Sequence, residues 1–337
     1  MKSNQKQFWI GIGISIISLS AIFLLIDPRE IWAALKTVQF GYLLWMTLGL
    51  IAFLVIRAIR WQFMLANGVS WGKVFHIQNI GYMLNMTMPF RLGDVARAIL
   101  IGNVPPATLA GGISTMVVER MLDMLFIITL LPFTLSMVET LPPWMQNGAR
   151  AFGVASILGI LLLVIAANQR ILATRIALTV FSRLPFLQTA AWLRRMNELL
   201  DGLDSLTRLK DGVILGGLSI LVWVPILFAY WVGMLAVGIT VSPLQVGFVV
   251  CAAALSVALP SSPGQIGIFH AAVIAALQVL GRPEGASASF AIVYHALNLT
   301  TMVVMGLIGL SGIGATFAQV VATAQRFTQR KEEGEVE

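Results

Sequence analysis

Long apolar runs separated by short polar connections dominate this sequence and restrict the folds open to it. Two of them, residues 8–26 and 40–59, are each long enough as a helix to cross a hydrocarbon core of about 30 Å. The chain of 337 residues is 58% hydrophobic and 11% charged, whereas a soluble domain carries roughly 25% charged residues. The sequence therefore predicts an all-α polytopic membrane protein.

Six of the apolar runs are expected to be transmembrane helices. They cover residues 8–26, 40–59, 113–138, 151–168, 212–238 and 287–313. The first run follows two lysines, as a signal peptide would, but no small-residue cleavage site closes it, so we interpret it as a retained anchor. The single cysteine, Cys251, excludes an internal disulfide.

Two further pairs of apolar segments are too short to be ordinary spans. Residues 74–89 pair with 95–110, and residues 244–259 pair with 266–280. Each limb is shorter than the roughly 20 residues of a full crossing, so we predict two re-entrant helical hairpins. The predicted hinge residues are Pro89 and Gly93 in the first hairpin and Pro260, Pro263 and Gly267 in the second.

The order of these segments predicts an inverted repeat. Residues 40–138 and 212–313 each contain a helix, a broken pair and a second helix, and the two units enter the membrane from opposite sides. Many transporters have this plan, and their interrupted segments mark the binding site. Residues 1–320 are accordingly expected to form one integral membrane domain.

Basic residues predict the orientation of the chain. Fifteen Lys and Arg fall in loops and tails on the side of the N-terminus, and four fall in loops on the other side, which places both termini in the cytoplasm. The net charge of +7 is attributed to this bias and to anionic lipids, with no nucleic acid as a partner. Residues 187–211 form an amphipathic pattern, either an interfacial linker helix or a docking surface, and residues 321–337 are predicted to be a disordered tail.

Charged residues inside the predicted span 113–138 are the most informative feature. Glu119 and Asp123 lie one turn apart on the same face, and Arg120 can reach Asp123 at a spacing of three. Each charge near the bilayer centre costs about 2.5–3.5 kcal/mol on insertion scales, so these side chains should face protein or water. They form either a structural ion cluster or a site that handles substrate or protons.

The first hairpin carries a possible anion site. Asn85 precedes the hinge, and Arg91, Asp94 and Arg97 follow at three-residue spacing on a helix that starts near Gly93. Arginine side chains and a helix N-terminus together could cradle a phosphate. In the alternative, Asp94 pairs internally with one of the two arginines and the motif only turns the chain.

Other polar residues allow two interpretations each. Arg57 and Arg60 stand at the end of the second predicted span, either as ordinary interfacial anchors or as substrate-binding residues. His270 and His295 lie at membrane depth, either as a pH-responsive pair or as hydrogen-bonded packing residues. No histidine has a ligand partner at metal-binding spacing, so neither a metal nor a cofactor is expected.

The second hairpin offers hydroxyls and bare backbone in place of charge. Ser261, Ser262 and Gly264 lie in its tip, so we interpret it as the uncharged half of a binding site. No Walker loop, G-x-S-x-G or H-E-x-x-H motif is present, and the chain is not expected to be an enzyme.

Four motifs together resemble the lysylphosphatidylglycerol synthase transmembrane family, the flippase-like domain found alone or fused to a lipid-modifying synthase. They are "RAIRW" at 57–61, "PFRLGDVARA" at 89–98, "VVERMLD" at 117–123 and "LPSSPGQIGIF" at 259–269. The resemblance covers about residues 5–320 and is that of a stand-alone member. Family members often have Glu at the position of His270 and Arg at that of His295; if those two form an ion pair, this chain has replaced both.

The resemblance implies movement of a polar-headed lipid between leaflets of a bacterial or archaeal plasma (inner) membrane. The lipid would bear a phosphate, as a phospholipid, an aminoacylated lipid or a polyprenyl-phosphate-linked lipid does. One alternative is a membrane partner subunit of a separately encoded synthase or glycosyltransferase. The other is an intramembrane enzyme on lipid-linked substrates, with Glu119 or Asp123 as general base.

Overall fold

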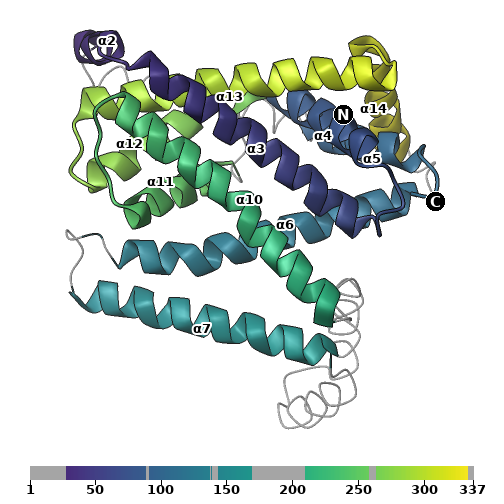
Figure 1. Ribbon diagram of the computed structural model, residues 1–337, viewed down its shortest axis with the longest axis horizontal. Coiled ribbons are helices and arrows are strands. Elements are labelled where there is room, and N and C mark those ends of the chain that lie inside the picture. Colours follow the sequence, from purple (N-terminus) through teal and green to yellow (C-terminus); the bar gives the residue numbers. More distant parts are fainter. Residues whose placement is uncertain are drawn as a thin grey trace.

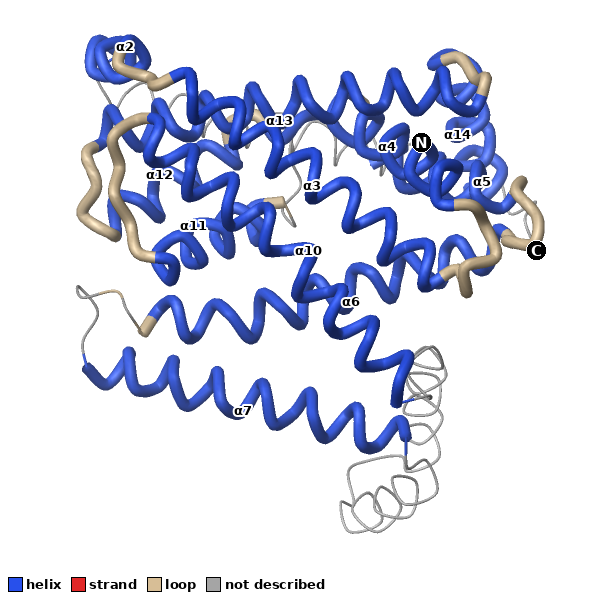
Figure 2. The backbone as a smooth tube through the Cα atoms, in the orientation of Figure 1, coloured by secondary structure: helices blue, strands red, loops and turns tan. Residues whose placement is uncertain are grey.

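The computed structural model describes residues 28–88, 91–136, 138, 143–168, 209–257 and 263–332, and these are helical apart from short connections (Figures 1 and 2). The predicted all-α class is confirmed for these ranges. The helices are α2 (Pro28–Lys36), α3 (Phe40–Met64), α4 (Trp71–Thr87), α5 (Leu92–Gly102), α6 (Leu109–Leu135), α7 (Pro143–Asn168), α10 (Leu209–Ala236), α11 (Pro243–Ser256), the 3₁₀ turn η3 (Pro263–Gln265), α12 (Ile268–Val279), α13 (Glu284–Ile313) and α14 (Phe317–Glu332).

Three of the described helices are long and apolar enough to cross a membrane: Phe40–Met64, Lys210–Ala236 and Glu284–Ile313. They correspond to three of the six predicted spans. The helices α6 and α7 have 27 and 26 residues and match two more by position. The predicted span 8–26 and nearly all of the amphipathic helix 187–211 lie outside the described residues.

The helices pack in a reciprocal pattern. The first helix of each predicted repeat packs against the other, α3 on α10. The α4 limb packs along α13, the last helix of the second repeat, whereas α11 packs on α6, the last helix of the first. Each hairpin therefore contacts the closing helix of the other repeat, which is the arrangement expected of two units related by inversion.

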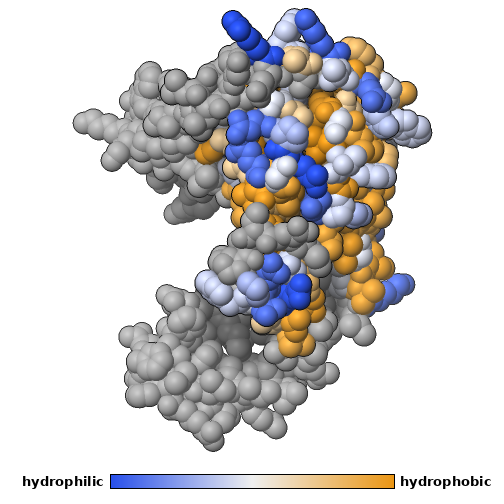
Figure 3. Space-filling model, turned by 90° about the vertical axis from the view of Figure 1, so that its left-hand side faces the viewer, coloured by the Kyte–Doolittle hydropathy of each residue, from blue (hydrophilic) through white to orange (hydrophobic). Residues whose placement is uncertain are grey.

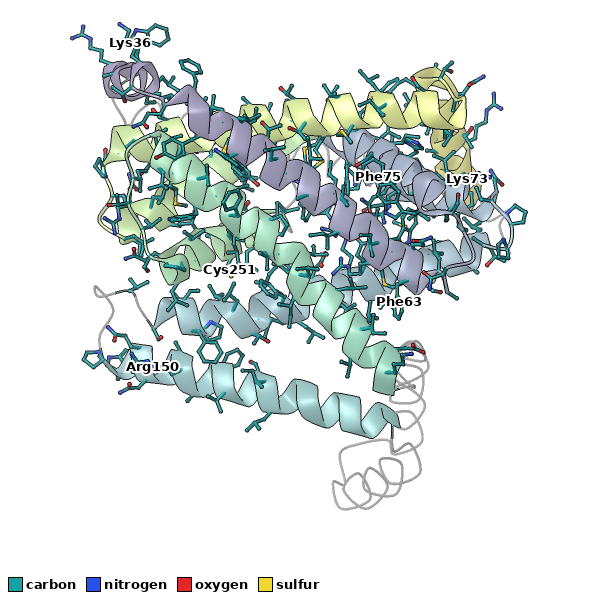
Figure 4. The ribbon with its side chains drawn as sticks, viewed as in Figure 1. Lys36, Phe63, Lys73, Phe75, Arg150 and Cys251 are labelled. Atoms are coloured by element: carbon teal, nitrogen blue, oxygen red, sulfur yellow. The ribbon has the colours of Figure 1, made fainter. Side chains whose placement is uncertain are left out.

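The two ends of the molecule are polar and its flanks are apolar. Lys36 on α2 and Arg150 on α7 lie at one end of the long axis, and Lys73 on α4 lies towards the other (Figure 4). Hydrophilic side chains gather on the end that faces the viewer in Figure 3, beside a broad hydrophobic area. Leu44, Ile220 and Leu307 are each exposed by more than half on α3, α10 and α13. Such a surface is stable in contact with lipid chains and would promote aggregation in water.

The short helices form two pairs that approach each other from opposite ends (Figure 1). The α4 and α5 limbs have 17 and 11 residues, and the α11 and α12 limbs have 14 and 12. At about 1.5 Å per residue these helices measure about 16–26 Å, less than a hydrocarbon core of about 30 Å. The turn η3 packs against α4, so the tips of the two pairs meet inside the molecule.

Glycines allow the close contacts at these tips. A Cβ on Gly93 would lie 1.9 Å from the carbonyl oxygen of Gly81, so only glycine lets α5 pack this closely on α4. Gly264 has φ +71, and a Cβ there would lie 3.2 Å from the carbonyl oxygen of Met86. The hinge assignment of Gly93 and the place of Gly264 in the predicted tip thus gain a steric reason, whereas Pro89 and Pro260 lie outside the described residues.

Several predicted boundaries were wrong. The second limb of the first hairpin ends at Gly102, and α6 begins at Leu109, because the proline-rich connection between them interrupts the helix. Residues 321–332 were predicted to be disordered but continue α14, whose apolar Val320 and Ala324 are buried against the helices α4, α5 and α13.

Candidate functional site

Five charged side chains form one buried cluster at the centre of the first repeat. Arg57 donates from Nε to Oε1 of Glu119 at 2.9 Å and from Nη2 to Oδ2 of Asp123 at 2.6 Å. Arg60 Nη1 lies 2.9 Å from Asp123 Oδ1, and Arg97 Nη2 lies 3.0 Å from Glu119 Oε2. All five are less than 9% exposed, so this is an ion network inside protein.

Helix periodicity explains how three helices supply the cluster. Arg57 and Arg60 are three residues apart on α3, and Glu119 and Asp123 are four apart on α6, so each pair shares one face. Arg97 projects from α5, where its guanidinium lies 4.2 Å from the centroid of the Trp61 ring. The interpretation of Arg57 and Arg60 as interfacial anchors was wrong, because α3 runs on to Met64 and places both arginines inside the fold. Their assignment as substrate-binding residues stays a prediction.

The cluster carries more positive than negative charge. Three arginines face two carboxylates, which leaves a formal charge of +1. Arg60 Nε and Nη2 and Arg97 Nε are buried without a hydrogen-bond partner. Buried donors without a partner are costly, so the cluster favours an additional acceptor such as an anion or water.

Asp94 and Arg120 form a separate pair at the edge of this cluster. Arg120 Nη2 lies 3.1 Å from Asp94 Oδ2, and Asn85 Nδ2 donates to Asp94 Oδ1 at 2.9 Å. The predicted contact of Arg120 with Asp123 was wrong, because Asp123 points to the arginines of α3. Asp94 likewise pairs with neither of the two arginines on its own helix face.

Arg91 takes a different role from Arg97. It caps α5 with φ 50, the left-handed region that non-glycine residues seldom occupy. Its Nη2 donates to the carbonyl oxygen of Val257 at the end of α11, which links the two hairpins directly. Arg91 is exposed and Arg97 is buried against Glu119, so the structure does not bring them together as the phosphate cradle that the spacing predicted.

The second hairpin contributes neutral groups. Gln265 in its tip has φ 58, and Gly267 with φ 89 precedes α12. The backbone N–H of Gly267 donates to Nδ1 of His270 at 3.3 Å. Pro263 begins the turn η3, whereas Ser261 and Ser262 lie outside the described residues.

His270 and His295 lie side by side. Their ring centroids are 4.8 Å apart, and each residue is 9% exposed. His295 Nε2 is buried without a hydrogen-bond partner. The two positions at which the family resemblance implies an ion pair are therefore adjacent, and here they hold two imidazoles. His270 has the local role of a hydrogen-bonded packing residue.

A cavity of about 210 Å³ lies where the two hairpin tips meet. Arg57 and Tyr82 border it from the first repeat, and Gln265, His295 and Asn298 border it from the second. Aromatic rings form much of the remaining wall, among them Trp223, Tyr230, Phe269 and Tyr294. Arg57 therefore joins the buried ion cluster to an open space that contains polar groups from both repeats.

Three residues of this site were not predicted from the sequence. Tyr82 lies between Arg57 and Arg97, with its hydroxyl 3.5 Å from Glu119 Oε1. Asn298 follows His295 by three residues and so shares its helix face, a signal that was available. Gln265 is a polar residue beside the tip glycine, and no sequence pattern singles it out.

Comparison with known families identifies the family of this chain. The model of the lysylphosphatidylglycerol synthase TM region matches residues 8–306. The chain belongs to this family. It is 23% identical over 326 residues to a UPF0104 membrane protein of Methanothermobacter thermautotrophicus, a match that covers 92% of the chain and 96% of that protein.

A second relative is longer. The glycosyltransferase AglD of Haloferax volcanii is 22% identical over 361 residues, and the match covers 96% of the chain but 57% of AglD. No solved structure matches the chain significantly. Membership of the family and the apolar helices identify an integral membrane protein that is linked to lipid modification.

Proposed function

We propose that this protein moves a phosphate-bearing lipid between the leaflets of the plasma (inner) membrane. The observation that carries the proposal is the meeting of the two hairpin tips at a cavity that contains polar groups from both repeats, next to a buried cluster of net positive charge. In this proposal both hairpins are re-entrant, the head group passes through the cavity, and the lipid chains stay in the bilayer.

The geometry supports Arg57 as the residue that meets the head group. Of the arginines in the described part of the chain, Arg57 alone borders the cavity, while Glu119 and Asp123 fix its guanidinium from behind. A guanidinium fork matches phosphate oxygens in geometry and charge. Arg60 and Arg97 hold the two carboxylates and so keep the region positive.

The contact between the hairpins supplies a means of gating. Arg91 on the first hairpin binds the backbone of the second through one hydrogen bond at an exposed position. Alternating access in inverted-repeat transporters moves one unit against the other around a fixed site. A single exposed bond at the tips can break and re-form during such a movement.

Translocation in proteoliposomes tests the proposal. Phosphatidylglycerol with a fluorescent acyl label is incorporated in both leaflets, and dithionite bleaches the outer leaflet; the protein should allow bleaching to proceed beyond the half seen in empty vesicles. Asn298→Trp fills the cavity and should reduce the rate at least about tenfold. Val304→Trp on the exposed face of the same helix α13 is the matched control and should change the rate less than about twofold.

One result would contradict the proposed function, and another would contradict the route through the cavity. Bleaching limited to half of the label in wild-type vesicles, with phosphatidylglycerol and with other phosphate-bearing lipids, would contradict the proposed function. Equal rates for Asn298→Trp and Val304→Trp would contradict the route through the cavity.

A second candidate is a partner subunit of a separate lipid-modifying enzyme. The relative AglD favours it, because that protein is named a glycosyltransferase and extends beyond the match. Co-purification of this chain with a membrane-associated glycosyltransferase or synthase from its own cell would support it. A chain that translocates lipid alone, without such a partner, would contradict it as the sole function.

A further inference from the structure

The described wall of the cavity has no negatively charged side chain to pair with the ammonium group of an aminoacylated lipid. Such a lipid carries one or more ammonium groups, and a buried ammonium requires a carboxylate or an equivalent partner. Among the described residues that border the cavity, none is Asp or Glu.

The two nearest carboxylates are already engaged. Glu119 contacts Arg57 and Arg97, and Asp123 contacts Arg57 and Arg60. With three guanidinium groups on two carboxylates, this side of the cavity repels an added cation. A phosphate beside Arg57 is attracted instead, because its negative charge neutralises the excess positive charge.

The wall from the second repeat is neutral and largely apolar, with a few hydrogen-bonding groups. It presents the amides of Gln265 and Asn298 beside the imidazole of His295. An amide both donates and accepts hydrogen bonds, and so does a hydroxyl. These two amides are therefore complementary to hydroxyl groups on a lipid head group. Asn298 and Gln265 make no side-chain hydrogen bond to another described residue, and their amides are available to a ligand.

The size of the cavity suits a small head group. Its volume is about 210 Å³, which accommodates a phosphate with a short polyol.

We propose that the cavity selects an anionic phosphodiester lipid with a small hydroxyl-bearing head group, such as phosphatidylglycerol, over its aminoacylated derivatives. The phosphate contacts Arg57, and the hydroxyls contact Asn298 and Gln265. This assignment rests on the proposed function for its site, but it concerns equilibrium binding and can be tested without transport.

Competitive binding provides the test. The purified full-length chain in non-ionic detergent is mixed with equal amounts of phosphatidylglycerol and lysyl-phosphatidylglycerol, and retained lipid is measured by native mass spectrometry. Wild-type protein should retain phosphatidylglycerol with a preference of at least about tenfold, equivalent to about 1.4 kcal/mol. Asn298→Asp places a carboxylate in the cavity and should reduce or invert that preference.

Two matched variants make the result specific. Asn298→Leu removes the amide without adding charge, so it should weaken phosphatidylglycerol binding and leave lysyl-phosphatidylglycerol disfavoured. Asn103→Asp adds the same charge at the exposed end of α5 and should leave the preference unchanged.

Several results would overturn the assignment. They are equal retention of the two lipids by wild type, no retention of either, or the same preference in Asn298→Asp as in wild type. Loss of translocation with the binding preference intact would contradict the proposed function and leave the head-group assignment standing. Translocation by a protein that shows no binding preference would support the proposed function and contradict the head-group assignment.

Discussion

The two hairpins have the same shape and opposite chemistry. Each consists of two short helices, and each has a non-glycine residue in the left-handed region at its tip, Arg91 in the first and Gln265 in the second. The first hairpin supplies Arg97 to a buried ion network, whereas the second supplies His270 and an amide. One repeat therefore provides fixed charge, and the other provides neutral hydrogen-bonding groups to the same cavity.

The largest expected effect comes from breaking the charged half. Glu119→Gln leaves three buried arginines with one carboxylate, so we expect a loss of about 3–5 kcal/mol in folding stability. Size-exclusion chromatography after heating in detergent should show a large fall in the melting temperature. Glu284→Gln makes the same chemical change at an exposed position and serves as the control. Similar melting temperatures for the two variants would show that the ion network contributes little.

The next effect comes from adding charge to the neutral half. His295→Arg alone introduces a buried cation near Arg57 without a partner and should destabilise the protein by roughly 3 kcal/mol. Adding His270→Glu should recover at least half of that loss, because the glutamate can pair with the new arginine and also accept the Gly267 N–H as a helix-capping residue. The double-mutant cycle measures the coupling. Additive effects would show that the two positions do not interact.

A smaller effect is expected where the hairpins touch. Arg91→Ala removes the bond to Val257 and keeps the strained backbone, so we expect a loss of about 1 kcal/mol. Arg91→Gly loses the same bond but relieves the left-handed strain, and it should be the more stable of the two variants. The reverse order of melting temperatures would contradict this account of the tip.

The smallest effect is expected at the partly exposed pair beside the cluster. Arg120 is 42% exposed in its side chain and Asp94 is 21% exposed, so solvent screens their attraction. Arg120→Gln should change stability by less than about 1 kcal/mol. A melting temperature as low as that of Glu119→Gln would place Arg120 within the buried network.

Much of the fold follows from the sequence because lipid limits the options. The positions of α3, α10 and α13 follow from apolar length, and the two broken pairs follow from proline and glycine at their tips. The reciprocal packing of each hairpin on the last helix of the other repeat supports the predicted inversion. Helix ends were less predictable, since α3 extends to Met64 beyond the predicted end at residue 59.

The partners of the charged residues could not be read from sequence spacing. Glu119 and Asp123 share a face as predicted, but Arg57 contacts Glu119 across 62 residues of sequence. Local spacing favoured Arg120 as the partner of Asp123, yet a residue three positions away can be outcompeted by arginines on a facing helix. The last five residues of α3 were not predicted, so the sequence placed Arg57 and Arg60 at a helix end and not among buried residues.

Cysteine labelling at a hairpin tip tests the central claim most directly, since re-entrant hairpins place both tips within the membrane. In a Cys251→Ser background, Gln265→Cys is compared with Asn103→Cys in the α5–α6 loop and Thr240→Cys in the α10–α11 loop. We predict that a membrane-impermeant maleimide labels each loop cysteine from one side, and labels Gln265→Cys at least about tenfold more slowly from both sides. Labelling of Gln265→Cys as fast as Asn103→Cys, from the same side, would place the tip at the membrane surface and contradict the account.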